Sequence, residues 1–193
     1  RMTGRYPGST YDPDRDQWLF WGRGHSEYKG TNVFHYATRT GLWSSSCRPE
    51  LPLEWSGGFL VRIEKSFRDR PHIPVHAYQT YAYDPPSGNV LFAKWEHLYL
   101  YDLREREFEP EPLKLPFPNR GVMRISLETT PKGVIVWTEG GELWRWEART
   151  WKKLPYSGPA LGAPWCDGTG MVYDPARDCL WIAGDTKRGI VRY

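Results

Sequence analysis

The sequence has few cysteines and no long apolar run. The first argues against a cysteine metal site, and the second against a membrane-spanning helix. Its three cysteines, Cys47, Cys166 and Cys179, form no C-x-x-C pair and no other metal-ligand spacing. The sequence leaves open whether Cys47 and Cys166 form a bridge. Cys179 precedes Leu180 and Trp181, so we expect it to be a small buried side chain. Because no run of 18 apolar residues is present, we expect no membrane-spanning helix.

An excess of charge of one sign is also absent. The 26 basic and 23 acidic residues are interspersed and give a formal net charge of +3. The densest basic stretch runs from Arg62 to Arg70, and Glu64 and Asp69 interrupt it, which is typical of a solvated loop surface. We therefore expect no nucleic-acid partner, and no membrane partner either.

Specific catalytic motifs are missing as well. The stretch Gly22-Arg23-Gly24 lacks the rest of a phosphate-binding loop. Ser26, His25 and Asp167 would supply the residue types of a hydrolase triad, but no nucleophile elbow surrounds the serine. The sequence therefore identifies no reaction.

One histidine pair, His72 and His76, has the spacing of a helical metal site. Pro71 and Pro74 are incompatible with the helix that would place both rings on one side. We therefore predict no metal site here, and no cofactor for the chain. His76 begins a predicted strand and is better placed to hydrogen bond a ligand, whereas His25 either does the same or holds its own loop.

The sequence does contain a strand–turn–strand unit that occurs four times. Each unit has a turn centred on proline, and the turns are Tyr11-Asp12-Pro13, Tyr83-Asp84-Pro85, Thr129-Thr130-Pro131 and Tyr173-Asp174-Pro175. Proline presets the backbone of the turn, and a preceding aspartate can bond the turn's amides. After a longer first interval, the units repeat at intervals in the forties, which indicates propeller blades or helical arrays. The β-branched and aromatic content favours blades.

The second half of each unit repeats too. The aligned third strands are Val33-Phe34-His35-Tyr36, Leu98-Tyr99-Leu100-Tyr101 and Leu143-Trp144-Arg145-Trp146. An aromatic residue follows shortly after each of them, at Trp43, Phe108 and Trp151. We expect these three aromatics to be equivalent and mostly buried, packed back across their blades.

These residues carry a resemblance to a known family. Asn32 to Tyr36 with Trp43, and Tyr101-Asp102 with Phe108, resemble kelch repeats. The stretch Gly22 to Tyr28 is similar to bacterial kelch-type proteins that resemble the central domain of galactose oxidase. The resemblance covers most of the chain and implies an extracellular or periplasmic location. It transfers no copper ligand, because no residue here matches the ligands of that enzyme.

We predict an all-β fold, a β-propeller of about four four-stranded antiparallel blades with the last one incomplete. The blades are expected near residues 8–45, 76–115, 121–154 and 168–193, with an insertion at 46–75 that could instead hide a further blade. Tyr193 aligns with Tyr36, before the strand that would match Leu42-Trp43. We therefore expect a partial propeller that has its remaining blades in a longer chain. Exposed apolar flanks on its first and last blades would drive self-association.

Blade geometry divides the loops between two faces of the propeller. The regular turns lie on one face, and the longer, irregular connections lie on the other, where a rigid scaffold can present binding residues. The candidate ligand-binding residues of this irregular loop face are Arg23, His25, Tyr28, His72, His76, Arg120, Trp165 and Asp167.

The leading hypothesis is a non-catalytic binding propeller that recognises a glycan or a protein through its irregular loop face. The alternative is part of an extracellular carbohydrate-active enzyme, an oxidase or a lyase, whose catalytic residues the sequence does not identify. A metal in the channel would favour the enzyme. Aromatic and arginine side chains that converge without a metal would favour the binding module.

Overall fold

The structure of the chain is a computed structural model, and it describes residues 8–21, 32–46, 79–119, 124–164, 170–184 and 189–193. The first sheet contains β1 (Gly8–Asp12), β2 (Gln17–Trp21), β3 (Phe34–Ala37) and β4 (Leu42–Ser45). The second contains β5 (Tyr81–Asp84), β6 (Asn89–Lys94), β7 (His97–Asp102) and β8 (Glu107–Phe108), and β9 (Leu113–Lys114) pairs with the start of β7.

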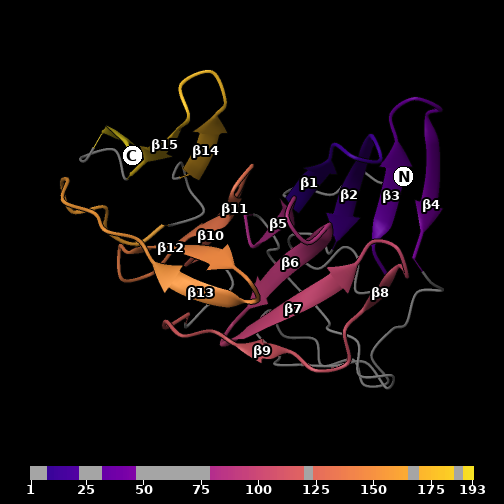
Figure 1. Cartoon of the computed structure of the whole chain (residues 1–193), viewed down its shortest axis with the longest axis horizontal. Coiled ribbons are helices and arrows are strands. Elements are labelled where there is room, and N and C mark those ends of the chain that lie inside the picture. Colours follow the sequence, from indigo (N-terminus) through magenta and orange to yellow (C-terminus); the bar gives the residue numbers. More distant parts are fainter. Residues whose placement is uncertain (1–7, 22–31, 47–78, 120–123, 165–169, 185–188) are drawn as a thin grey trace, which may run out of the picture.

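The third sheet contains β10 (Ser126–Thr130), β11 (Gly133–Trp137), β12 (Leu143–Glu147) and β13 (Thr150–Lys153). The fourth contains β14 (Gly170–Asp174), β15 (Cys179–Ala183) and β16 (Ile190–Arg192). Every pairing is antiparallel and, apart from that of β9 with β7, joins strands that are consecutive in the chain. Figure 1 shows the four sheets one after another along an arc, which confirms the predicted all-β, propeller-like fold.

The fourth sheet has three strands among the described residues, as the sequence predicts. Beyond β16, Tyr193 exchanges backbone hydrogen bonds with Leu180, just as Tyr36 pairs with Trp18 in the first sheet. The predicted insertion at 46–75 lies, apart from Ser46, outside the described residues. None of the described residues forms a helix long and apolar enough to span a membrane.

The turns between the first two strands form as the Asp-Pro pattern predicts. The Oδ1 atom of Asp12 accepts the backbone N–H groups of Asp14 and Arg15 at 3.0 and 3.3 Å. In the fourth sheet, Asp174 makes the same two bonds, at 3.0 and 3.2 Å. The third sheet has Thr130 at this position, and its hydroxyl accepts the N–H of Lys132 at 3.2 Å. These local bonds help to set the hairpin register within each sheet.

Each sheet has two faces, because successive side chains of a strand point to opposite sides. We call the face directed at the preceding sheet the N-side face and the opposite one the C-side face. The first strands β1, β5, β10 and β14 lie next to one another, in chain order. Every junction between neighbouring sheets therefore packs a C-side face on an N-side face.

The apolar core consists of three clusters, one for each junction. In the first junction, Leu19 and Trp21 pack against a mainly aromatic N-side face that includes Tyr83, Tyr101 and Phe108. The second junction joins the residues Ala82, Leu91, Leu98, Val134, Val136, Trp146 and Trp151, among others. The third joins Ile135, Trp137 and Leu143 to Met171, Leu180 and Ile182. A buried side chain of this size stabilises a fold by about 1.5–3 kcal/mol.

The three aligned aromatics are equivalent in register, but not in burial. Trp43, Phe108 and Trp151 pair with the aromatic residues Tyr36, Tyr101 and Trp146. Phe108 and Trp151 are buried, whereas 48% of Trp43 is exposed, so the prediction that all three are mostly buried is wrong for Trp43. The reason is that a preceding sheet covers Phe108 and Trp151, and no described sheet covers the N-side face of the first sheet.

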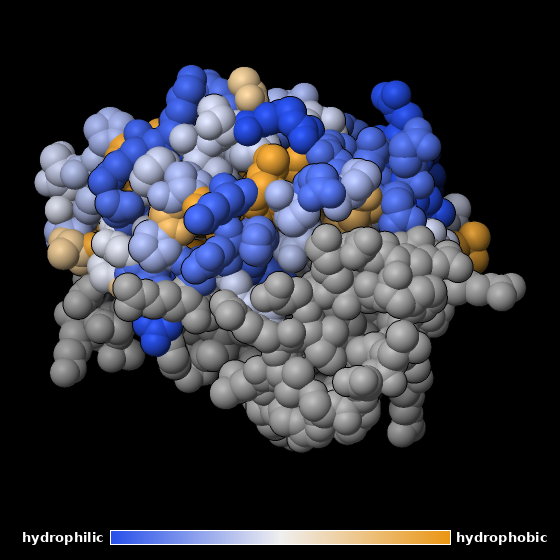
Figure 2. All heavy atoms as spheres, turned by 90° about the horizontal axis from the view of Figure 1, so that it is seen from below, coloured by the Kyte–Doolittle hydropathy of each residue, from blue (hydrophilic) through white to orange (hydrophobic). Residues whose placement is uncertain are grey.

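The remaining apolar side chains reach the surface only in places. In the view of Figure 2, the described surface is mostly hydrophilic, and hydrophobic residues appear as small separate patches. Cys179 is a buried free thiol, as predicted. Cys47 and Cys166 lie outside the described residues.

Candidate functional site

The predicted ligand-binding residues of the irregular loop face all lie outside the described residues, so their grouping stays a prediction. They are Arg23, His25, Tyr28, His72, His76, Arg120, Trp165 and Asp167. The connection from β9 to β10 is described as far as Asn119, the neighbour of Arg120.

Next to this predicted loop face, Asn119, the sequence neighbour of Arg120, has a polar side chain that is unpaired within the described part of the chain. Its side chain is buried, and neither polar atom of its amide has a hydrogen-bond partner among the described residues. An unpaired buried amide costs about 1–3 kcal/mol, so a water or a polar ligand group would be stabilised there.

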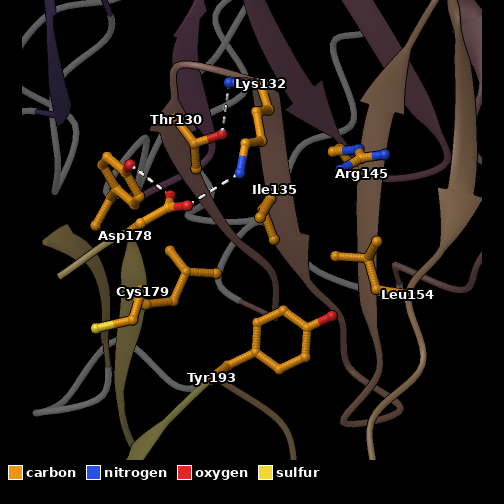
Figure 3. Close-up of a pocket in the computed structure, with 10 residues that line it drawn as sticks. Thr130, Lys132, Ile135, Arg145, Leu154, Asp178, Cys179 and Tyr193 are labelled. Atoms are coloured by element: carbon orange, nitrogen blue, oxygen red, sulfur yellow. Dashed lines mark hydrogen bonds and ion pairs between the residues drawn. The ribbon is translucent and has the colours of Figure 1, made fainter. Parts of the chain in front are cut away.

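A cleft of about 200 Å³ lies between the third and fourth sheets. Figure 3 shows side chains of both sheets around it. The residues that line the cleft are Thr130, Lys132, Ile135, Arg145, Leu154, Tyr173, Asp178, Cys179, Leu180 and Tyr193.

The aromatic contacts at this junction differ from those of the other sheets. In the second and third sheets, an aromatic residue of the fourth strand packs on the aromatic residue of the third strand, with ring centroids 5.1 Å apart for Tyr101–Phe108 and 5.3 Å apart for Trp146–Trp151. Tyr193 takes the corresponding third-strand position in the fourth sheet. The ring beside it is that of Tyr156, which lies outside any strand, with ring centroids 6.1 Å apart.

Fixed polar contacts form one end of the cleft. Lys132 Nζ lies 3.0 Å from Asp178 Oδ2, and the Tyr173 hydroxyl donates to Asp178 Oδ1 at 2.8 Å (Figure 3). The bond from Tyr173, followed by the one from Lys132, lowers the pKa of Asp178, and the same bond raises the pKa of Tyr173. Asp178 is therefore a carboxylate and Tyr173 a neutral phenol at pH 7. Their hydrogen bond keeps both side chains in place, and neither group is suited to exchange a proton at this pH.

Arg145 on β12 supplies a donor inside the cleft. Its Nη2 atom lies 3.4 Å from Glu147 Oε1, and its buried Nε has no hydrogen-bond partner among the described residues. Ile135, Leu154 and Leu180 provide apolar walls nearby. A guanidinium of this kind binds carboxylate or hydroxyl oxygens strongly, since charge-assisted bonds in a partly dry site are about twice as strong as neutral ones.

Sequence reasoning missed Arg145, although a signal was present. Arg145 takes the register position of His35 in the first sheet and Leu100 in the second, both of which are buried. A charged residue at a position that its repeats bury is a reason to expect a functional contact.

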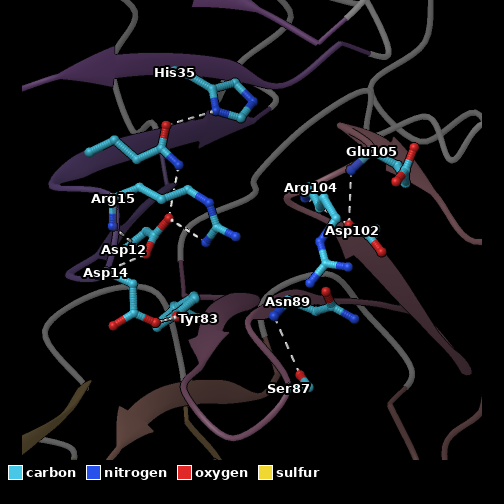
Figure 4. Close-up of polar contacts among 11 residues, drawn as sticks. Asp12, Asp14, Arg15, His35, Tyr83, Ser87, Asn89, Asp102, Arg104 and Glu105 are labelled. Carbon is cyan, nitrogen blue, oxygen red and sulfur yellow. Dashed lines mark hydrogen bonds and ion pairs between the residues drawn. The ribbon is translucent and has the colours of Figure 1, made fainter.

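A second polar network joins the first and second sheets, and its role is structural. His35 lies 3.1 Å from Gln17 Oε1, and Gln17 in turn donates to Asp12 at 2.8 Å (Figure 4). On its other side, His35 lies 3.0 Å from the Tyr101 hydroxyl. Burial, with a smaller contribution from Arg106, lowers the pKa of His35 to about 4. His35 is therefore neutral at pH 7 and linked to both sheets, which is a structural role.

Metal-ligating side chains are not gathered in the part of the chain that the structure describes. No group of three or more His, Cys, Asp or Glu residues there could hold a metal ion.

Comparisons with known proteins bear on the fold. No protein-family model matches the sequence, and no curated protein matches it. Among solved structures, the chain is similar to a structural genomics protein of unknown function from Bacteroides thetaiotaomicron, with a TM-score of 0.56 and 14% identity over 96% of this chain. The match covers 46% of that protein, so the chain spans about half its length. The likeness therefore supports the propeller arrangement, and it does not confirm membership of the kelch or galactose-oxidase families.

Proposed function

We propose that the protein is a non-catalytic binding propeller that recognises a glycan or a protein. The observation that carries the proposal is the cleft between the third and fourth sheets, where Arg145 Nε is buried and unpaired among the described residues. The ionisable pair beside it, Lys132 and Asp178, is already bonded within the chain. Such a site has a donor to offer a ligand, and its Lys132–Asp178 pair is engaged within the chain and not aimed at a ligand.

The chemistry of the cleft favours a ligand with a carboxylate. Arg145 brings positive charge, whereas Asp178 balances that of Lys132, and Ile135, Leu154 and Leu180 bring apolar contact. A uronic-acid unit of a glycan and an acidic side chain of a protein both combine an anionic group with carbon surface. The irregular loop face would contribute the remaining contacts, and the unpaired amide of Asn119 supports a polar ligand there.

The proposal is tested by a binding screen with matched variants. The purified protein is applied to an array of acidic and neutral oligosaccharides and to acidic peptides. We expect binding of a carboxylate-bearing ligand, and Arg145→Met should weaken it by about tenfold or more. Arg149→Met is the control, because Arg149 belongs to the same sheet and its guanidinium is occupied by Glu109, at 2.6 and 2.9 Å.

Two outcomes would contradict the proposal. Recovery of a chemically converted ligand by mass spectrometry would identify an enzyme, in line with an oxidase or a lyase. Unchanged affinity in both Arg145→Met and Arg120→Met would show that neither the cleft nor the loop face binds the ligand.

A further inference from the structure

The N-side face of the first sheet exposes aromatic side chains that the other sheets bury. Trp18 and Trp43 are 40% and 48% exposed. At their register positions in the second sheet, Val90 is fully buried and Phe108 is nearly so, because the first sheet covers them. Tyr11 is partly exposed on the same face and stacks on Trp18, with ring centroids 5.3 Å apart. This face therefore has the composition of a junction, without a sheet that covers it among the described residues.

The C-side face of the fourth sheet exposes aliphatic side chains in a similar way. Ile190 is 71% exposed, whereas Leu98 and Leu143, at the same register position, are buried by the following sheet. Val172 is 55% exposed, and its equivalent Ala82 is buried. No described sheet covers this face either.

The two exposed faces are the two kinds of face that meet in every junction. In the first junction, a C-side face with Leu19 and Trp21 packs on an N-side face rich in aromatic rings. In the third, a C-side face with Trp137 packs on a mainly aliphatic N-side face. Each of the three junctions thus joins an apolar C-side face to an apolar N-side face, and the exposed side chains of the fourth and first sheets are apolar in the same way.

We propose that the C-side face of the fourth sheet packs on the N-side face of the first sheet of a second copy of this chain. Two such contacts, related by a two-fold axis, would close a ring that leaves neither face in water. Apolar surface rimmed by polar residues is typical of such an interface. A contact of one tryptophan-rich face with another is a different arrangement, since it would leave Ile190 and Val172 exposed.

The proposal is tested by light scattering coupled to size-exclusion chromatography of the whole chain. We expect a dimer, and we expect Trp43→Glu and Ile190→Glu each to raise the dissociation constant by about tenfold or more. Both residues are exposed, so both variants should fold, which circular dichroism and a melting curve check. Leu42→Glu is the control, because Leu42 is also exposed but lies on the opposite face of β4 from Trp43.

Mixing the two variants gives the sharpest result. A copy with Trp43→Glu keeps its Ile190, and a copy with Ile190→Glu keeps its Trp43, so the mixture should form one native junction and associate again. A wild-type monomer at the highest soluble concentration would overturn the proposal. Association that neither variant weakens would also overturn it, as would a mixture that stays monomeric.

Discussion

The junction between the first and second sheets is filled, whereas the junction between the third and fourth sheets contains a cleft, although both have the same register. In the first, Phe108 packs on Trp21 and Tyr101, with ring centroids 4.9 and 5.1 Å apart. In the third, Trp137 and Tyr193 take the positions of Trp21 and Tyr101, and the ring beside Tyr193 is that of Tyr156, 6.1 Å away between centroids and outside any strand. The comparison indicates that an aromatic residue on the fourth strand fills a junction, and that a cleft remains where a loop tyrosine packs in its place.

The same two junctions also differ in one buried hydrogen bond. The backbone N–H of Tyr83 donates to the hydroxyl of Thr10 at 3.0 Å, and the N–H of Tyr173 donates to Glu128 Oε1 at 3.0 Å. The hydroxyl of Thr10 is neutral at every pH at which the protein would be studied, whereas the carboxyl of Glu128 can lose its proton. Burial raises the pKa of Glu128 to about 7. The fourth sheet is therefore attached through a group whose charge changes near neutral pH, and the second sheet is not.

Replacement of the closing aromatic should have the largest effect. Phe108→Ala removes a buried ring and should lower the free energy of unfolding by about 3–5 kcal/mol. Trp43→Ala, at the same register position, should lower it by less than about 1 kcal/mol, because this ring is half exposed. Urea titration at low protein concentration measures both. Equal losses would show that the two positions are not distinguished by a covering sheet.

A pH series should separate the two junctions next. The pKa of Glu128 is about 7 in the folded chain and 4.5 ordinarily, so the folded state binds more protons between these values. The contribution of Glu128 to the free energy of unfolding should therefore fall by about 3 kcal/mol as the pH rises from about 4.5 to 7. Glu128→Gln should remove this contribution and make the protein more stable at pH 8. If the wild type and this variant gave parallel curves, Glu128 would not be the buried group that titrates.

His35 should make the free energy of unfolding change with pH in the opposite direction to Glu128. Its pKa is about 4 in the folded chain and 6.5 ordinarily, so the unfolded state binds more protons between these values. The free energy of unfolding should rise by about 3 kcal/mol from pH 4 to 6.5, and the two slopes should nearly cancel in the wild type. Glu128→Gln should uncover the rise and His35→Gln the fall, both by denaturant titration at several pH values. A wild-type curve as steep as that of either variant would contradict this account.

The smallest effect is expected at the mouth of the cleft. Lys132 and Asp178 form an ion pair in which both side chains are more than half exposed. Lys132→Ala should therefore change the free energy of unfolding by less than about 1 kcal/mol, and by less still at high salt. A double-mutant cycle with Asp178→Asn measures the coupling. A coupling well above this value would mean that the pair is shielded from solvent and helps to hold the fourth sheet.

The strands and their register could be predicted from the sequence because they depend on local patterns. The Asp-Pro turns align the hairpins, and alternating residues assign each side chain to a face. The exposure of Trp43 could not be predicted in this way, because it depends on which sheet packs on its face. The cleft was missed for a related reason: it depends on how the third and fourth sheets pack, which the pattern of the individual strands does not give. Arg145 was a sign of it, because its equivalents in the first and second sheets are buried and uncharged.

The most direct test of the account is to measure the solvent exposure of individual tryptophans by fluorine NMR. The protein is labelled with 5-fluorotryptophan in the Ile190→Glu background, where a second copy should not cover the first sheet, and Trp→Phe variants assign the resonances. The account predicts a clear solvent isotope shift between H₂O and D₂O for Trp43, and none for Trp21 and Trp137, which are fully buried. A Trp43 resonance as insensitive to D₂O as that of Trp21 would contradict the claim that a neighbouring sheet, and not the repeat alone, decides which of these rings is buried.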